Sequence, residues 1–159
     1  MPSLDDLKRM ADKKAEPLLA ELKKDPNNAV TLNHLGVLYK SAHQFKEAED
    51  YFQKSLQADP KNPNVRTDLA TCLYLTGDTD GAIAELQKTL NYDPKHAGAL
   101  MNLGIIEYKS KNDTKAAVAA WEKLLKLHPD FEQKELVQHM IDQAKQAKDN
   151  PSPLGITKG

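Results

Sequence analysis

The side chains with the most suggestive spacing for chemistry lie in the glycine-flanked stretch 77–81. Asp78, Asp80 and Gly81 form a D-x-D-G fragment of the kind that opens a calcium-binding loop. A complete loop also needs further oxygen ligands and a later bidentate glutamate, and Glu85 is not at that spacing. The fragment therefore predicts an ordinary turn between two helices, since Gly and Asp are common turn residues.

Nucleophiles and metal ligands are equally sparse. Cys72 is the single cysteine, no histidine lies near it in sequence, and we expect it to be a small buried residue. None of the histidines forms the i, i+4 pair of a helical zinc site. The chain also lacks a Ser/His/Asp arrangement, a glycine-rich phosphate loop and a carboxylate pair. We predict a protein that is not an enzyme and that uses no cofactor and no metal. The histidines are His34, His43, His96, His128 and His139.

Composition narrows the class of partner. The 159 residues include 22 Lys and Arg against 23 Asp and Glu, so there is no basic excess to attract nucleic acid or an anionic membrane. No apolar run approaches the roughly 20 residues that cross a bilayer. The N-terminal residues lack the basic and apolar regions of a signal peptide. We expect a cytoplasmic protein as written, or a periplasmic one if a leader or anchor was removed, and the sequence leaves both open.

Four prolines divide the chain into blocks of nearly constant length. Pro26, Pro60, Pro94 and Pro129 are separated by 34, 34 and 35 residues, and the extra residue falls in the stretch 109–113. A fixed period near 34 is typical of stacked helix-turn-helix units. Each proline follows the second helix of a block, because a helix cannot easily continue into it.

The blocks also match internally. Small residues recur where two helices of one block must approach, and large apolar residues recur at core positions. We expect overpacking if the small positions are enlarged, and we expect Trp121 to be a core residue. The small residues are Gly36, Ala70 and Gly104 on the first helices and Ala48, Ala82 and Ala117 on the second; the large ones are Phe52, Leu86 and Trp121.

This pattern of Leu-Gly, Tyr, Ala, a large apolar residue and Pro resembles the tetratricopeptide repeat (TPR). The resemblance implies an all-α fold, a right-handed superhelical solenoid of antiparallel helix pairs with terminal capping helices. It places three repeats within residues 25–129, at about 27–60, 61–94 and 95–129. Residues 1–24 would form an N-terminal helical cap with half a repeat, residues 130–149 a C-terminal capping helix, and residues 150–159 a flexible tail.

Two features of the caps can be predicted in more detail. Pro17 should kink the N-terminal helix or restart it, dividing an amphipathic lead-in, 3–15, from the half repeat, 16–24. In the C-terminal cap, an apolar face is expected to cover the last repeat. That face consists of Leu136, Val137, Met140, Ile141 and Ala144.

In this fold the first helices line a concave groove, and helical spacing selects the side chains that face it. Tyr74 and Tyr108 are the expected anchors for a peptide or helix, although they could equally serve to pack the first helices together. His34 faces the groove, either as a pH-sensitive contact or as a solvated residue. The predicted groove residues are Asn33, His34, Val37, Lys40 and Ser41 in repeat one; Thr67, Asp68, Thr71, Tyr74 and Leu75 in repeat two; and Met101, Asn102, Ile105, Tyr108 and Lys109 in repeat three.

One ligand class of the family is disfavoured. Some TPR domains hold a C-terminal carboxylate with Lys and Asn from the first repeat and Lys and Arg from the third. The corresponding positions here are Asn33, Val37, Gly98 and Asn102, and none of them is a cation. We therefore predict that this chain does not capture the C-terminal carboxylate of a chaperone tail.

The last third of the chain resembles periplasmic TPR domains of c-type cytochrome biogenesis, which present apocytochrome segments to the haem-attachment machinery. The resemblance lies in residues 117–129 and in the following Leu136, Val137 and Ile141. We predict a non-catalytic protein-protein interaction module that binds a partner peptide or helix in its groove, as an adaptor or assembly factor. We expect no nucleic acid or membrane contact and a monomer. The alternative is a structural scaffold that self-assembles through its caps or convex face.

Overall fold

The computed structural model describes residues 1–149, and these form eight α-helices and no strand. Contacts divide the chain into two compact units, residues 1–96 and residues 97–159. The N-terminal unit, unit 1, contains α1 (Leu4–Lys24), α2 (Ala29–Ser41), α3 (Phe45–Ala58), α4 (Pro63–Leu75) and α5 (Thr79–Tyr92). The C-terminal unit, unit 2, contains α6 (Ala97–Lys109), α7 (Thr114–Leu127) and α8 (Lys134–Asp149). The predicted tail, 150–159, lies outside the described residues.

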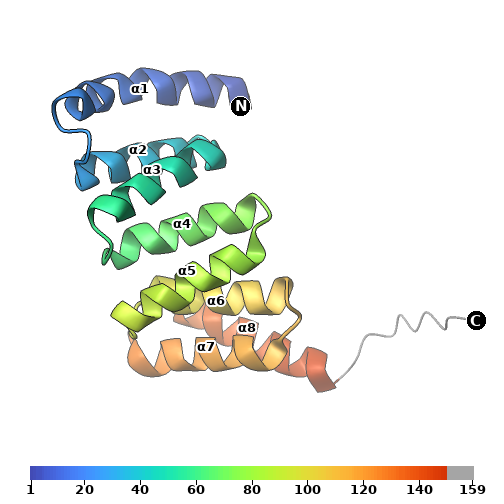
Figure 1. Ribbon diagram of the computed structural model, residues 1–159. Helices are drawn as coiled ribbons and strands as arrows, with labels where there is room; N and C mark the ends of the chain where they lie inside the picture. The colour runs from blue at the N-terminus through green and yellow to red at the C-terminus, as the bar shows by residue number, and fades with distance from the viewer. Residues whose placement is uncertain (150–159) are drawn as a thin grey trace, which may run out of the picture. The chain divides into compact units, whose positions relative to one another are not determined.

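Helices pack as sequential neighbours in both units. In unit 1, α2 pairs with α3 and α4 pairs with α5, while α3 also packs on α4 and α1 packs on α2 (Figure 1). In unit 2, α6 pairs with α7 and α8 packs on α7. We propose that the three pairs are the repeats 27–60, 61–94 and 95–129, with α1 and α8 as the caps.

The residue that precedes each of the four prolines ends a helix. Asp25, Asp59, Asp93 and His128 end α1, α3, α5 and α7, with φ between −139° and −127° and ψ between 73° and 88°. The proline ring disfavours the helical conformation at its predecessor, which favours ending the helix at these four positions.

The turn inside each pair also repeats. Residues 42–44, 76–78 and 110–113 separate the paired helices, so the extra residue of the third block lies in its turn. Each turn holds one residue with positive φ: His43 at 58°, Gly77 at 98° and Asn112 at 53°. Only glycine adopts this conformation freely, and Asn and His are the commoner exceptions. The D-x-D-G fragment belongs to the second turn, where Asp78 caps α5 by accepting a bond from the Gly81 N–H at 2.9 Å.

The small residues of the first helices lie against large rings. A Cβ added to Gly36 would meet the Phe52 ring at 2.5 Å, and one added to Gly104 would meet Trp121 Nε1 at 2.2 Å. The fully buried rings therefore fill the space that a side chain on these helices would occupy. This contact explains why glycine accompanies an aromatic residue in the first and third pairs, whereas Ala70 accompanies the smaller Leu86 in the second.

The prediction that Pro17 restarts the first helix is wrong, because α1 is continuous from Leu4 to Lys24. Proline cannot donate a hydrogen bond to the carbonyl of Lys13, four residues earlier. Both residues are exposed, so water can satisfy that carbonyl. The helix also has a strong start, since Ser3 and Asp6 form a reciprocal capping box.

The C-terminal cap differs slightly from its predicted composition. Val137, Ile141 and Ala144 are fully buried, but Leu136 is half exposed. The apolar face of α8 is therefore wider than the part that covers α7. The remaining exposed apolar surface is available to another contact.

Candidate peptide-binding site

In unit 1, the predicted binding residues lie on α2 and α4, and several apolar ones are exposed. Val37 is 39% exposed and Leu75 is 52% exposed, and His34 and Ser41 are also exposed. Val30, which the sequence-based selection missed, is 64% exposed on the first turn of α2. Contiguous exposed apolar surface marks a protein-binding site, whereas single exposed aliphatic side chains are ordinary.

One ion pair joins these two helices. The Lys40 ammonium lies 2.5 Å from the Asp68 carboxylate, and the two side chains are 28% and 30% exposed. The pair joins α2 to α4 and leaves little net charge at this place. A ligand charge would therefore compete with this pair for either group.

Most hydroxyl groups of the predicted set already donate to the backbone. Thr67 donates to the Pro63 carbonyl at 2.8 Å, Thr71 to the Thr67 carbonyl at 3.1 Å, and Ser41 to the Val37 carbonyl at 2.9 Å. Thr67 is also buried. The Oδ1 atom of Asn33 is buried as well, without a hydrogen-bond partner among the described residues. The polar part of this surface is therefore smaller than the sequence suggests.

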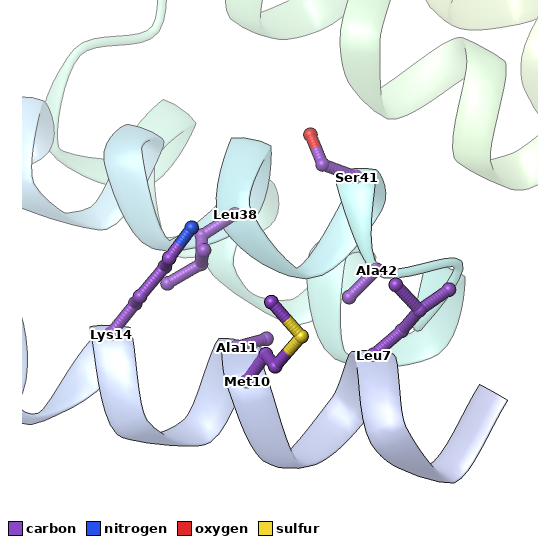
Figure 2. A pocket seen from close by; sticks show the side chains of 7 residues that line it. All are labelled: Leu7, Met10, Ala11, Lys14, Leu38, Ser41 and Ala42. Carbon is purple, nitrogen blue, oxygen red and sulfur yellow. The ribbon is translucent and has the colours of Figure 1, made fainter. Parts of the chain in front are cut away.

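Unit 1 has a pocket between α1 and α2 that the sequence did not reveal. Its volume is about 110 Å³. Met10 and Lys14 of α1 stand on one side, and Leu38 and Ser41 of α2 stand on the other (Figure 2). Of the predicted residues only Ser41 lines it. The remaining lining residues are Leu7, Ala11 and Ala42.

In unit 2, three predicted residues come together in a larger pocket. Ile105, Tyr108 and Lys109 of α6 line a cavity of about 230 Å³. The other lining residues are Trp121 of α7 and Met140 and Gln143 of α8. Met101 and Asn102 lie on the same helix as the first three, but they do not line the cavity. The capping helix thus supplies part of the wall, which the groove prediction did not include.

Trp121 holds this pocket in shape. Its indole N–H donates to the Met101 carbonyl at 3.2 Å. Its ring also lies 6.0 Å from the Tyr108 ring, centroid to centroid, at an angle of 56°. Tyr108 therefore packs partly against the core, and its ring has a defined position beside the cavity.

The reactive side chains are not assembled into a site. Burial raises the pKa of the Cys72 thiol to about 12, so its thiolate is not formed at neutral pH. Among the side chains that the structure describes, those of residues 1–147, no group of three His, Cys, Asp or Glu could hold a metal ion. Within the same residues no helix is long and apolar enough to cross a membrane.

Comparison with known proteins decides the family. The TPR domain of cytochrome c-type biogenesis protein H matches residues 15–135. The chain belongs to this family. Its fold is an all-α TPR solenoid, and a TPR domain is in general a non-catalytic module for protein-protein interaction.

Other proteins are similar to this chain over part of its length. A probable UDP-N-acetylglucosamine–peptide N-acetylglucosaminyltransferase, SPINDLY of Hordeum vulgare, is 35% identical over 109 residues, which are 64% of this chain and 11% of that protein. A TPR repeat-containing protein of Rhizobium etli is 27% identical over 129 residues, which are 77% of this chain and 63% of that protein. The TPR domain thus spans about a tenth of the barley relative, and the transferase activity belongs to the barley protein.

Solved structures support the fold. MamA superposes with a TM-score of 0.71 at 22% identity, covering 89% of this chain and 91% of that one. The first TPR domain of Spaghetti (RPAP3), bound to the HSP90 peptide SRMEEVD, gives a TM-score of 0.70 at 22% identity, covering 79% and 97%. These similarities show the TPR fold alone.

Proposed function

We propose that this TPR domain is a non-catalytic adaptor or assembly factor that binds a peptide or helix of a partner protein on the exposed faces of its first helices. The match over residues 15–135 is the observation that carries the proposal, because it spans all three proposed repeats. On the same basis we propose that the partner process is the maturation of c-type cytochromes and that the ligand is a segment of an apocytochrome.

The physical chemistry of the first helices agrees with such a ligand. An apocytochrome has no haem to cover its apolar side chains, so its segments carry apolar anchors that a folded protein would bury. Val37 and Leu75 in unit 1, and the walls of the α6–α8 pocket in unit 2, offer apolar surface to such anchors. A few such anchors supply most of the energy in a protein interface.

Binding of purified haem-free cytochrome c polypeptide, compared with the haem-containing protein, tests the proposal. We expect the double variant Tyr74→Ala/Tyr108→Ala to bind the haem-free chain at least tenfold more weakly, because it loses both proposed anchors. Tyr92→Ala is the matched control, since Tyr92 is an exposed tyrosine on α5, a second helix. Circular-dichroism melts of the variants check that folding is retained.

Two results would refute this assignment. The first is undiminished binding by a folded double variant, which would remove the two tyrosines from the site. The second is equal binding of the haem-free and haem-containing proteins, which would remove the apocytochrome as the specific ligand.

The scaffold alternative has one observation in its favour. Leu4, Met10 and Leu19 leave apolar surface exposed along α1. Sedimentation velocity separates the two functions. A chain that sediments as a monomer at protein concentrations of tens of micromolar excludes self-assembly through this helix, and a dimer or larger species would support it.

A further inference from the structure

The α6–α8 pocket has the dimensions of a side-chain site. Its volume of about 230 Å³ is below the roughly 300–1,000 Å³ of pockets that take small-molecule ligands. Ile105, Met140 and the rings of Tyr108 and Trp121 give it mainly apolar walls. A pocket of this size and composition fits one bulky apolar side chain, such as Leu, Met or Phe.

The charge that lines the pocket is positive only. Lys109 is the one ionisable cation among the six lining residues, and none of the six is a carboxylate. Among the described side chains, those of residues 1–147, Lys109 has no salt bridge, in contrast to Lys40, which pairs with Asp68. The Lys109 ammonium is therefore available to an anion brought by a ligand, without the cost of breaking an existing pair.

The pocket continues along α8. Leu136, Met140 and Gln143 follow one another at spacings of four and three residues, so they lie on one face of the helix. Leu136 is 50% exposed although it is a large aliphatic residue. This face extends the apolar wall beyond the pocket itself, while Gln143 supplies an amide that can bond to a peptide backbone.

We propose that the α6–α8 pocket selects partner segments that present one bulky apolar side chain together with an Asp or Glu within about four residues. The apolar side chain would enter between Ile105 and Met140, and the carboxylate would pair with Lys109. This assignment rests on the proposed peptide-binding function and specifies the chemistry of its ligand. Charge complementarity supports it, because an acidic residue is the group that the pocket lacks and that its free lysine can bind.

The pocket between α1 and α2 has a related composition but fits the proposal less well. Lys14 lies at its edge, likewise without a salt bridge within residues 1–149, beside Met10 and Leu38 (Figure 2). Its volume of about 110 Å³ is half as large. Only one of its seven lining residues belongs to the predicted binding set, against three of six for the pocket in unit 2.

Selection from a phage-displayed library of random peptides tests the proposal, with the purified chain as bait. We expect the retained peptides to be enriched in an apolar residue followed or preceded by Asp or Glu within about four positions. A synthetic peptide from this set should bind about tenfold more weakly when its acid is replaced by Lys, which corresponds to about 1.4 kcal/mol. Its binding should also weaken as salt is raised.

Lys109→Glu provides the reciprocal measurement. We expect this variant to prefer the Lys-containing peptide over its acidic counterpart. Lys123→Glu is the matched control, because Lys123 is an exposed lysine on α7 that lines neither pocket. This control should keep the preference of the parent chain. The emission of Trp121, the single tryptophan, reports whether the pocket of each variant stays folded.

Each outcome decides between the two proposals. If the parent chain retains no peptide, both the peptide-binding function and the acidic preference are wrong. Retained peptides without an acidic bias, or an unchanged preference in folded Lys109→Glu, would overturn the acidic preference alone. Self-association of the chain that Lys109→Glu abolishes would assign the pocket to a second copy and would also overturn it.

Discussion

The contact between Gly36 and Phe52 yields a quantitative prediction about how the repeats are packed. A Cβ on residue 36 would lie 2.5 Å from Cδ1 and Cε1 of the ring, about 0.9 Å closer than the 3.4 Å at which ordinary contacts begin. Phe52 is fully buried, so the ring cannot move aside into solvent. We therefore expect Gly36→Ala to force a shift of the α2–α3 pair.

The expected loss of stability combines two opposing effects. Overpacking a buried site costs about 1–3 kcal/mol, and this contact is short enough for the upper part of that range. Replacing glycine by alanine inside a helix gains about 1 kcal/mol. The net loss for Gly36→Ala is therefore about 1–2 kcal/mol. For a chain of this length that loss lowers the melting temperature by about 2–4 °C per kcal/mol.

Repeat two suggests the compensating change. There, Ala70 and Leu86 occupy the positions of Gly36 and Phe52, and both are fully buried. Phe52→Leu alone should cost about 1 kcal/mol, because it leaves part of the ring volume empty. In that background we expect Gly36→Ala to be neutral or stabilising by up to about 1 kcal/mol, since the helix propensity gain then acts without the clash.

Urea denaturation followed by far-ultraviolet circular dichroism measures all four proteins of this double-mutant cycle. Hydrogen exchange of the α2 and α3 amides localises the change to this pair, because a chain of stacked repeats need not unfold in one step. The reasoning is refuted if Gly36→Ala destabilises the Phe52→Leu protein as much as it destabilises the parent. A stabilised Gly36→Ala single variant would also contradict it.

Three further predictions concern other parts of the chain. Thr76→Val should lower stability by about 1–3 kcal/mol in urea denaturation, because it removes the 2.5 Å bond from the Thr76 hydroxyl to the buried Glu49 carboxylate, and Thr76→Ser should retain most of it. Pro17→Ala should increase the free energy of unfolding by up to about 3 kcal/mol, because it restores an N–H donor to the Lys13 carbonyl inside α1. The urea midpoint should rise accordingly, and a lowered midpoint would contradict this. Burial, and secondarily the charge of Asp113, raises the pKa of Glu107. The contribution of Glu107 to folding stability is therefore favourable at acid pH and is lost as pH rises through the raised pKa. Glu107→Gln should therefore raise the urea midpoint at about pH 7 more than at about pH 4, and an equal effect at both pH values would exclude this cause.

Much of the fold could be predicted because the same sequence pattern recurs in each helix pair. A proline after each second helix disfavours the helical conformation at its predecessor, and its regular spacing can be read from the chain alone. The inserted residue could also be placed, since a turn accepts an extra residue that a packed helix does not. His43 and Asn112 show the limit of single-residue reasoning. Neither type indicates positive φ by itself, yet both stand where the second repeat has Gly77.

Pro17 and the pockets were harder to predict for a different reason. The cost of a proline in a helix depends on whether the orphaned carbonyl faces water, which is a property of the packed structure. Met140 and Gln143 were visible as part of an amphipathic helix, but their place beside Ile105 depends on how α8 packs against α7. Sequence spacing selects a helix face, whereas a pocket requires two faces to meet.

The distribution of paired and unpaired charges bears directly on specificity. With 22 basic and 23 acidic side chains the whole chain exerts almost no long-range attraction on a partner. In unit 1, Lys40 pairs with Asp68 and Arg66 pairs with Glu85, so the surface of the first helices can discriminate ligands mainly by apolar shape. In unit 2 Lys109 has no such partner within the described residues. If the two units bind one ligand, discrimination by charge should therefore arise at the α6–α8 pocket, and exchanging Lys109 should change which peptides bind more than it changes the rate at which they arrive.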